Sequence, residues 1–192
     1  AAPGLNERLA AVDSLLKEKK TAEAEQELLK IEKERAGKDG DLFRVYRKLM
    51  DISGGLAKKE RWADKALALP GLTVPQRTEV LSALVGSADY GTRLYGMYID
   101  LLPEAEIKQM AARDRACREE LARLNPGNAG LRIALGDLYA LEGQADKADA
   151  EYAAALAISN LPAMQQGLAL VGRAGAALLK KDRAGAVKFL EE

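Results

Sequence analysis

The sequence predicts an all-α protein in which amphipathic helices pair into hairpins. Alanine and leucine are frequent and aromatic side chains make up only 5% of the residues, a composition that favours packed helices over sheet. Apolar residues recur every three or four positions in one segment after another, as they do on the buried face of a helix. The chain is 48% hydrophobic and 30% charged, which is typical of a folded domain.

The first two predicted helices form a hairpin over residues 5–38. Leu9 and Val12 mark the apolar side of the first helix. Thr21 is expected to cap the second helix, and Leu28 belongs to that helix's apolar side. The pairing is that of a degenerate hairpin.

Residues 39–128 predict further helices with irregular spacing. Asp41 is expected to cap a third helix. A fourth helix must stop at Pro70, because proline cannot supply the amide that a continuing helix requires. Thr73 opens a fifth helix, and Pro103 opens a longer one.

The clearest hairpin covers residues 129–162. Its first helix spans 129–141 and is ended by Gly143, as a left-handed C-terminal residue would end it. Its second helix starts near Asp146, the expected cap, and continues to Ile158. Short side chains let two helix backbones approach closely. They recur here at Gly136, Ala148 and Ala155.

This hairpin resembles the tetratricopeptide repeat, a helical hairpin of about 34 residues. The resemblance rests on Leu135, Gly136, Tyr139, Gly143, Ala148, Tyr152 and Ala155, preceded by Leu124, Asn125 and Pro126. The sequence departs from the family at Arg132, where a bulky apolar residue is usual. The resemblance implies a right-handed α-α superhelix of stacked hairpins, a scaffold whose members bind many unrelated partners.

We therefore predict one tetratricopeptide-like domain over residues 1–192. Within it, 5–38 is a degenerate hairpin, 39–128 is irregular, 129–162 is the best repeat and 163–192 is a partial repeat. A repeat array needs a polar helix over its last apolar face, and no such helix follows 163–192. We therefore expect the chain to be part of a longer protein.

The composition argues against most enzyme chemistry. The sequence contains no histidine, which removes the commonest general base and zinc ligand. A single cysteine, Cys117, excludes an internal disulfide and any multi-cysteine metal site, and its place on an apolar stripe predicts burial. The glycine pairs 54/55 and 172/175 are not phosphate loops, because no strand precedes them and no Gly-Lys-Ser/Thr follows them. We expect no enzymatic activity, no cofactor and no metal.

The resemblance implies a concave groove lined mainly by the first helix of each hairpin. The residues at such positions are Ile133, Ala134, Asp137, Leu141, Leu168, Val171, Gly172 and Gly175. Of these we predict that Ile133, Ala134, Asp137, Leu141, Leu168 and Val171 bind a partner. The Lys, Asn and Arg donors with which some family members hold a peptide carboxylate are missing from these positions. The groove therefore suits an amphipathic helix or an extended apolar peptide. The alternative for each residue is packing between neighbouring helices.

Other surfaces give weaker predictions. Tyr95 and Tyr98 are predicted as an additional contact surface, with burial in the core as the alternative. Acidic residues dilute the basic cluster around Tyr46 and Trp62, which favours a solvated face over nucleic-acid binding. Lys+Arg and Asp+Glu both total 29, so no overall field attracts nucleic acid or an anionic membrane. No stretch reaches the roughly 20 apolar residues that cross a bilayer, so we expect no membrane insertion.

The small residues at 1–4 fit either a signal-peptidase product or a cloning remnant. We favour export from a bacterial cytoplasm, to the periplasm or the exterior, over a cytoplasmic location.

The predicted function is a non-enzymatic scaffold that mediates protein-protein interaction through its concave groove. The alternatives are a helical spacer or dimerisation module and an accessory domain of a larger enzyme. The identity of the partner and the oligomeric state stay open.

Overall fold

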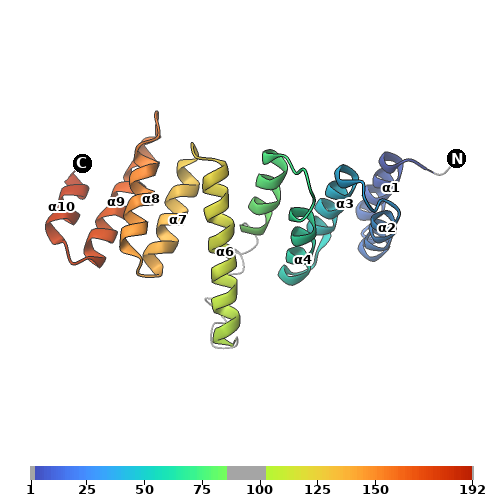
Figure 1. Ribbon diagram of the computed structural model, residues 1–192, viewed down its shortest axis with the longest axis horizontal. Helices are drawn as coiled ribbons and strands as arrows, with labels where there is room; N and C mark the ends of the chain where they lie inside the picture. The colour runs from blue at the N-terminus through green and yellow to red at the C-terminus, as the bar shows by residue number, and fades with distance from the viewer. Residues whose placement is uncertain (1–2, 86–102, 192) are drawn as a thin grey trace. The chain divides into compact units, whose positions relative to one another are not determined.

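The computed structural model describes residues 3–85 and 103–191, and every regular element within these ranges is a helix. The chain divides into two compact units, Ala1–Leu101 and Leu102–Glu192. In each unit, helices that follow one another in the sequence pack side by side (Figure 1). The expectation of one continuous domain over 1–192 stays a prediction.

The first unit is a series of helical hairpins with an aliphatic core. Its helices are α1 (Leu5–Lys17), α2 (Thr21–Glu34), α3 (Asp39–Ile52) and α4 (Leu56–Leu67), followed by a helical segment at 74–85. The apolar residues at three- and four-residue spacing point into the core. Those with at most 2% of their surface exposed include Val12, Leu28, Ile31, Val45, Leu49, Met50, Val80 and Leu81.

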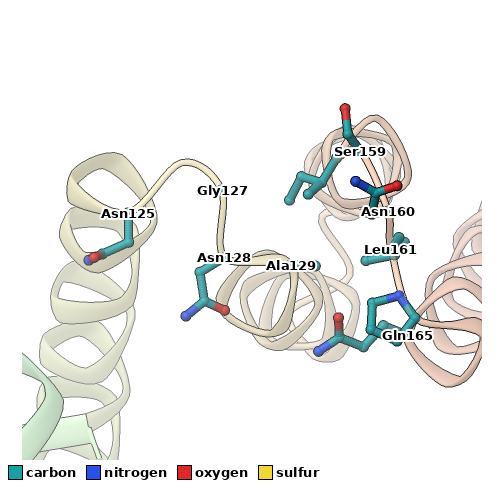
Figure 2. A pocket seen from close by; sticks show the side chains of 10 residues that line it. Asn125, Gly127, Asn128, Ala129, Ser159, Asn160, Leu161 and Gln165 are labelled. Atoms are coloured by element: carbon teal, nitrogen blue, oxygen red, sulfur yellow. The ribbon is translucent and has the colours of Figure 1, made fainter.

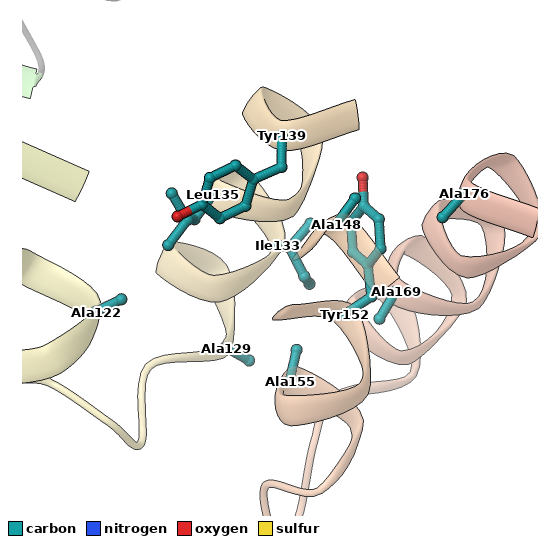
Figure 3. Packing of buried hydrophobic residues seen from close by; sticks show 10 residues of the cluster. All are labelled: Ala122, Ala129, Ile133, Leu135, Tyr139, Ala148, Tyr152, Ala155, Ala169 and Ala176. Carbon is teal, nitrogen blue, oxygen red and sulfur yellow. The ribbon is translucent and has the colours of Figure 1, made fainter. Parts of the chain in front are cut away.

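The second unit has a core built mainly from alanines around two tyrosines. Its helices are α6 (Glu104–Leu124), α7 (Ala129–Leu141), α8 (Ala145–Leu156), α9 (Ala163–Leu179) and α10 (Arg183–Glu191). Each packs on the next, and α7 also packs on α9. Figure 3 shows Tyr152 among Ile133, Ala148 and Ala169. The short side chains of the two alanines let the helices approach closely.

Several predicted helix ends are confirmed. Thr73 opens the segment at 74–85 through reciprocal bonds, in which the Thr73 amide donates to Gln76 Oε1 at 3.0 Å and the Gln76 amide donates to Thr73 Oγ1 at 3.4 Å. Gly143 ends α7 with a left-handed backbone, φ +72°. Cys117 is buried on α6, as its apolar stripe predicted.

Three predicted caps are wrong, because each helix begins earlier than the prediction placed it. Thr21, Asp41 and Asp146 lie inside the first turns of α2, α3 and α8, whose N-caps are Lys20, Lys38 and Gln144. A side chain that already lies within the helix does not cap it. Asp41 and Asp146 instead place negative charge near the positive end of a helix dipole.

Candidate protein-binding face

One side of α9 is exposed, apolar and uncharged. Arg173 is the one charged residue between 163 and 179, and it turns toward α8 and α10. Its Nε donates to Asp149 Oδ1 at 2.7 Å, and its guanidinium lies 4.1 Å from the centre of the Phe189 ring. The opposite side of α9 therefore presents apolar atoms to solvent without any charge to hold water there.

Five of the exposed residues of α9 form a continuous line that we call the α9 stripe. Its members are Met164, Leu168, Val171, Gly175 and Leu178. They repeat at alternating spacings of four and three residues, so they lie above one another on one face of the helix. The four apolar side chains are 52–74% exposed, which is unusual for large aliphatic residues in a folded unit.

The neighbouring face of α7 adds one apolar and one acidic side chain. Leu141 is 86% exposed, and Asp137 is also exposed. Ala134 is half-buried, whereas Ile133 is 7% exposed and belongs to the core cluster. Because α7 packs directly on α9, we group the exposed residues of these two adjoining helices under the name α7–α9 face.

The Tyr152 ring of α8 packs against both α7 and α9. A Cβ on Gly136 of α7 would lie 2.7 Å from the Tyr152 ring, and one on Gly172 of α9 would lie 2.5 Å from it. Only glycine therefore fits at either position while the ring stays in place. The Tyr152 hydroxyl donates to Asp137 Oδ1 at 2.7 Å, and this hydrogen bond fixes the position of the Asp137 carboxylate.

The electrostatics of this contact follow from burial. Loss of solvent around the Tyr152 ring, followed by the hydrogen bond to Asp137 and the charge of that carboxylate, raises the pKa of Tyr152 above its ordinary value of 10. Tyr152 therefore stays a neutral hydrogen-bond donor to Asp137 at physiological pH. The Asp137 side chain is exposed on an otherwise apolar face.

The structure places the predicted site residues unevenly. Asp137, Leu141, Leu168, Val171 and Gly175 are exposed on the α7–α9 face, while Gly172 is half-buried against Tyr152. Ile133 is the least accessible member, since it packs in the core. Tyr95 and Tyr98 lie outside the described residues. Whether any of them binds a partner stays a prediction.

Sequence reasoning missed two members of the α9 stripe, Met164 and Leu178. Both continue the spacing set by Leu168 and Val171, so the periodicity of α9 contained the signal that would have found them.

A cleft of about 540 Å³ lies near the loops that lead into α7 and α9, and Figure 2 shows its lining. Amide side chains dominate the lining, and two of them serve helix ends. Asn128 Oδ1 accepts the Leu131 amide at 3.2 Å, and Asn125 Nδ2 donates to the Leu121 carbonyl at 3.0 Å. No charged side chain lines this cleft, so it offers a solvated loop surface rather than a charged site.

Across the part of the chain that the structure describes, no three His, Cys, Asp or Glu side chains are grouped as metal ligands. Within the same residues, no helix combines the length and apolarity that a membrane span requires.

No protein-family model and no curated protein matches the chain. Among solved structures, MamA protein matches 97% of this chain over 88% of its own, with a TM-score of 0.60 and 18% sequence identity. MamA is a tetratricopeptide-like helical solenoid. This chain has a tetratricopeptide-like fold. The predicted fold class, an all-α superhelix of stacked hairpins, is thereby confirmed. A likeness at this identity concerns the tetratricopeptide-like fold alone, because one fold hosts many functions.

Proposed function

We propose that this chain is a non-enzymatic scaffold that binds a protein partner through the α7–α9 face. The observation that supports the proposal is the uncharged apolar surface of α9, where Met164, Leu168, Val171 and Leu178 are all more than half exposed. Contiguous exposed apolar surface of this kind marks interaction sites in folded proteins. Tetratricopeptide-like folds supply such surfaces to protein partners.

The partner that best fits this face is an amphipathic helix. Residues spaced alternately by four and three along the α9 stripe match the apolar stripe of a second helix packed alongside. From Met164 to Leu178 the stripe extends roughly 21 Å, the length of about 14 helical residues. A lysine or arginine on the partner would pair with Asp137, whose position is fixed by Tyr152.

Two alternatives give the same exposed face another role. A dimerisation module would cover the α9 stripe with a second copy of the chain. An accessory domain of a larger enzyme would cover it with a catalytic domain. The partner in each case is a protein surface, so the three hypotheses differ in the identity of the occupant.

The proposal is tested by photo-crosslinking followed by affinity measurement. A benzophenone amino acid at Leu168, in cells of the source organism, should crosslink one protein, which is then purified. Val171→Asp should weaken the binding of that protein about tenfold or more, because the substitution places a charge in the apolar contact. The control is Val187→Asp on α10, since Val187 is 54% exposed and Val171 is 59% exposed.

The α7–α9 proposal requires the two valine variants to differ. Unchanged affinity in both variants would contradict it, as would the same loss of affinity in both. If the crosslinked product is a second copy of the chain and Val171→Asp converts a dimer to a monomer, the dimerisation module replaces the scaffold. Circular dichroism of each variant must match the unmodified protein, so that lost binding is not lost folding.

A further inference from the structure

The first unit contains a cleft of about 660 Å³ between α2 and α4, with α3 at its base. We call it the α2–α4 cleft. Its lining is Gln26, Leu29, Lys30, Glu32, Lys33, Ala36 and Gly37 of α2 and the turn after it, Leu42 and Tyr46 of α3, and Arg61, Trp62 and Lys65 of α4. Four cationic side chains and one carboxylate therefore meet around one concave surface, in a protein whose formal net charge is zero.

The inner wall of the cleft is an aromatic pair that is already covered. The rings of Tyr46 and Trp62 stack with centroids 6.1 Å apart and planes inclined by 19°. Tyr46 is 7% exposed and Trp62 is 4% exposed. Lys65 Nζ lies 4.7 Å from the centre of the Trp62 ring, in the geometry of a cation-π contact. The pair is therefore a rigid apolar wall rather than a free stacking surface.

The single carboxylate of the cleft is neutralised within it. Glu32 Oε1 accepts a hydrogen bond from Lys65 Nζ at 2.5 Å and another from the Tyr46 hydroxyl at 3.2 Å. Lys65 and Glu32 thus form a closed ion pair against the aromatic wall. Neither side chain offers its charge freely to a ligand.

The other three cations of the cleft are not balanced in this way. Lys30 has only a long contact of 3.8 Å to Glu27, and its side chain is 66% exposed. The Arg61 guanidinium lies 5.2 Å from the centre of the Trp62 ring. Among the residues that the structure describes, neither Arg61 nor Lys33 has a carboxylate within 4.0 Å. The cleft consequently carries local positive charge at its rim and apolar surface inside.

We propose that the α2–α4 cleft binds an acidic peptide segment of a partner protein. Carboxylates of the peptide would pair with Arg61, Lys33 and Lys30, and the planar guanidinium of Arg61 can donate two parallel hydrogen bonds to one carboxylate. An apolar peptide side chain would lie against Leu29, Leu42 and the aliphatic stems of the lysines. This site is in the first unit, so it does not depend on the α7–α9 face.

The same features disfavour a single-stranded nucleic acid. Base stacking needs an open aromatic face, but Trp62 and Tyr46 are buried and Lys65 lies over both rings. The balanced net charge also supplies no long-range attraction for a phosphate backbone. An acidic peptide that also carries apolar side chains would contact both the cationic rim and the apolar interior of the cleft.

The test is fluorescence anisotropy of a labelled hexapeptide of four glutamates and two leucines, titrated with the full chain. The variant Lys33→Glu with Arg61→Glu should weaken binding roughly tenfold, because two attractions become repulsions. The matched control is Lys17→Glu with Lys188→Glu, which makes the same charge change at two exposed lysines outside the cleft. The control should stay within about twofold of the unmodified chain.

Two further arms locate the site. Trp62 is the only tryptophan in the chain, so its emission should change when the peptide binds and should not change in the cleft variant. A hexapeptide with lysines in place of the glutamates should bind the cleft variant better than the unmodified chain. Both readings depend on the sign of charge at the cleft and would not follow from a general loss of structure.

Three results would overturn the proposal. The first is equal affinity of the cleft variant and the control variant for the acidic peptide. The second is no binding by the unmodified chain at millimolar peptide. The third is tighter binding of a thymidine oligonucleotide than of the peptide, lost in the cleft variant, which would assign the cleft to nucleic acid. None of these results bears on the α7–α9 face.

Discussion

The Tyr152 ring fixes the distance between three helices because glycines lie on two sides of it. The ring is 2% exposed and its hydroxyl is bound to Asp137, so it has no alternative position into which it could move. Gly136 and Gly172 thus serve packing, although glycine is a poor helix former. This explains why two helix interiors tolerate the residue.

Gly172→Ala should destabilise the protein by about 1–3 kcal/mol, because the new methyl group overlaps the Tyr152 ring. The matched control is Gly175→Ala in the same helix, where nothing lies within 4 Å of the added Cβ. That substitution should stabilise by about 0.5–1 kcal/mol through helix propensity alone. Urea unfolding of both variants checks the prediction. Effects of the same sign would contradict it.

Two other tyrosines predict how stability changes in alkaline solution. Burial, with Glu32 for Tyr46 and Glu119 for Tyr139, raises the pKa of each to about 12 from an ordinary 10. The folded protein then binds more protons than the unfolded chain between about pH 10 and 12. The stabilisation by each tyrosine is therefore complete below about pH 10 and is lost as the pH rises through about 12.

Tyr139→Phe should reduce this alkaline loss. Raising the pH from about 8 to about 11 should cost the unmodified chain roughly 1 kcal/mol more than it costs the variant. Urea unfolding at both pH values measures the difference, which cancels the titration of lysines common to both proteins. An identical pH dependence in the two proteins would show that Tyr139 titrates normally when folded.

The burial of Ile133 shows where residue-level prediction stopped. Its position within the repeat predicted a groove residue, yet it packs with Tyr152 and Ala169 in the core. The small residues at Gly136, Ala148 and Ala155 were interpreted correctly as sites of close helix approach. Size requirements at a helix crossing are visible in a sequence, whereas the exposure of one apolar residue depends on which helix lies next to it.

At the level of the elements, the two hairpins of the second unit share a register. An offset of 38 residues aligns buried Ala148 with buried Ala186 and buried Tyr139 with buried Ala177. The same offset aligns Ile133, 7% exposed, with Val171, 59% exposed. Equivalent positions thus differ in burial because Ile133 belongs to the core cluster with Tyr152 of α8 and Ala169 of α9, whereas Val171 lies outside that cluster. Periodicity predicted both helices but could not predict this difference.

The start of α7 provides a test of helix capping. Asn128 Oδ1 accepts the Leu131 amide at 3.2 Å, whereas Gln144, the N-cap of α8, makes no such bond. Asn128→Ala should therefore destabilise by about 1 kcal/mol. Gln144→Ala should change stability by less than about 0.5 kcal/mol. Thermal unfolding compares them, and equal losses would mean that the observed cap is not stabilising.

At the scale of the whole molecule, the two units can be followed separately. Trp62, the single tryptophan, lies in the first unit and reports on it by fluorescence. The Tyr152 contact lies in the second unit. Repeat architectures are stabilised mainly by contacts between neighbours, so a local lesion need not unfold distant helices. The Gly172→Ala variant should then lower the midpoint of the circular dichroism transition more than that of Trp62 fluorescence. Equal shifts of both midpoints would show that the units unfold together.

Composition and periodicity were sufficient for the fold class because helices of this type are specified locally. The pattern around Tyr139 and Tyr152 led to a tetratricopeptide-like fold, which the likeness to MamA confirms. Neither of the two surfaces proposed to bind a partner could be predicted as fully from the sequence. The α2–α4 cleft depends on which lysines find carboxylate partners, and those partners come from other helices, as Glu32 does for Lys65.

The Tyr152 contact also has a mechanical consequence. α10 is held by a small cluster of Ala174, Ala177 and Ala186 with the partly buried Phe189. α9 is held by a full aromatic ring that it shares with α7. Under a stretching force applied along the chain, α10 should detach first and at low force. Extension should then pause until the force suffices to separate α9 from the ring, so the second unit would lengthen in unequal steps.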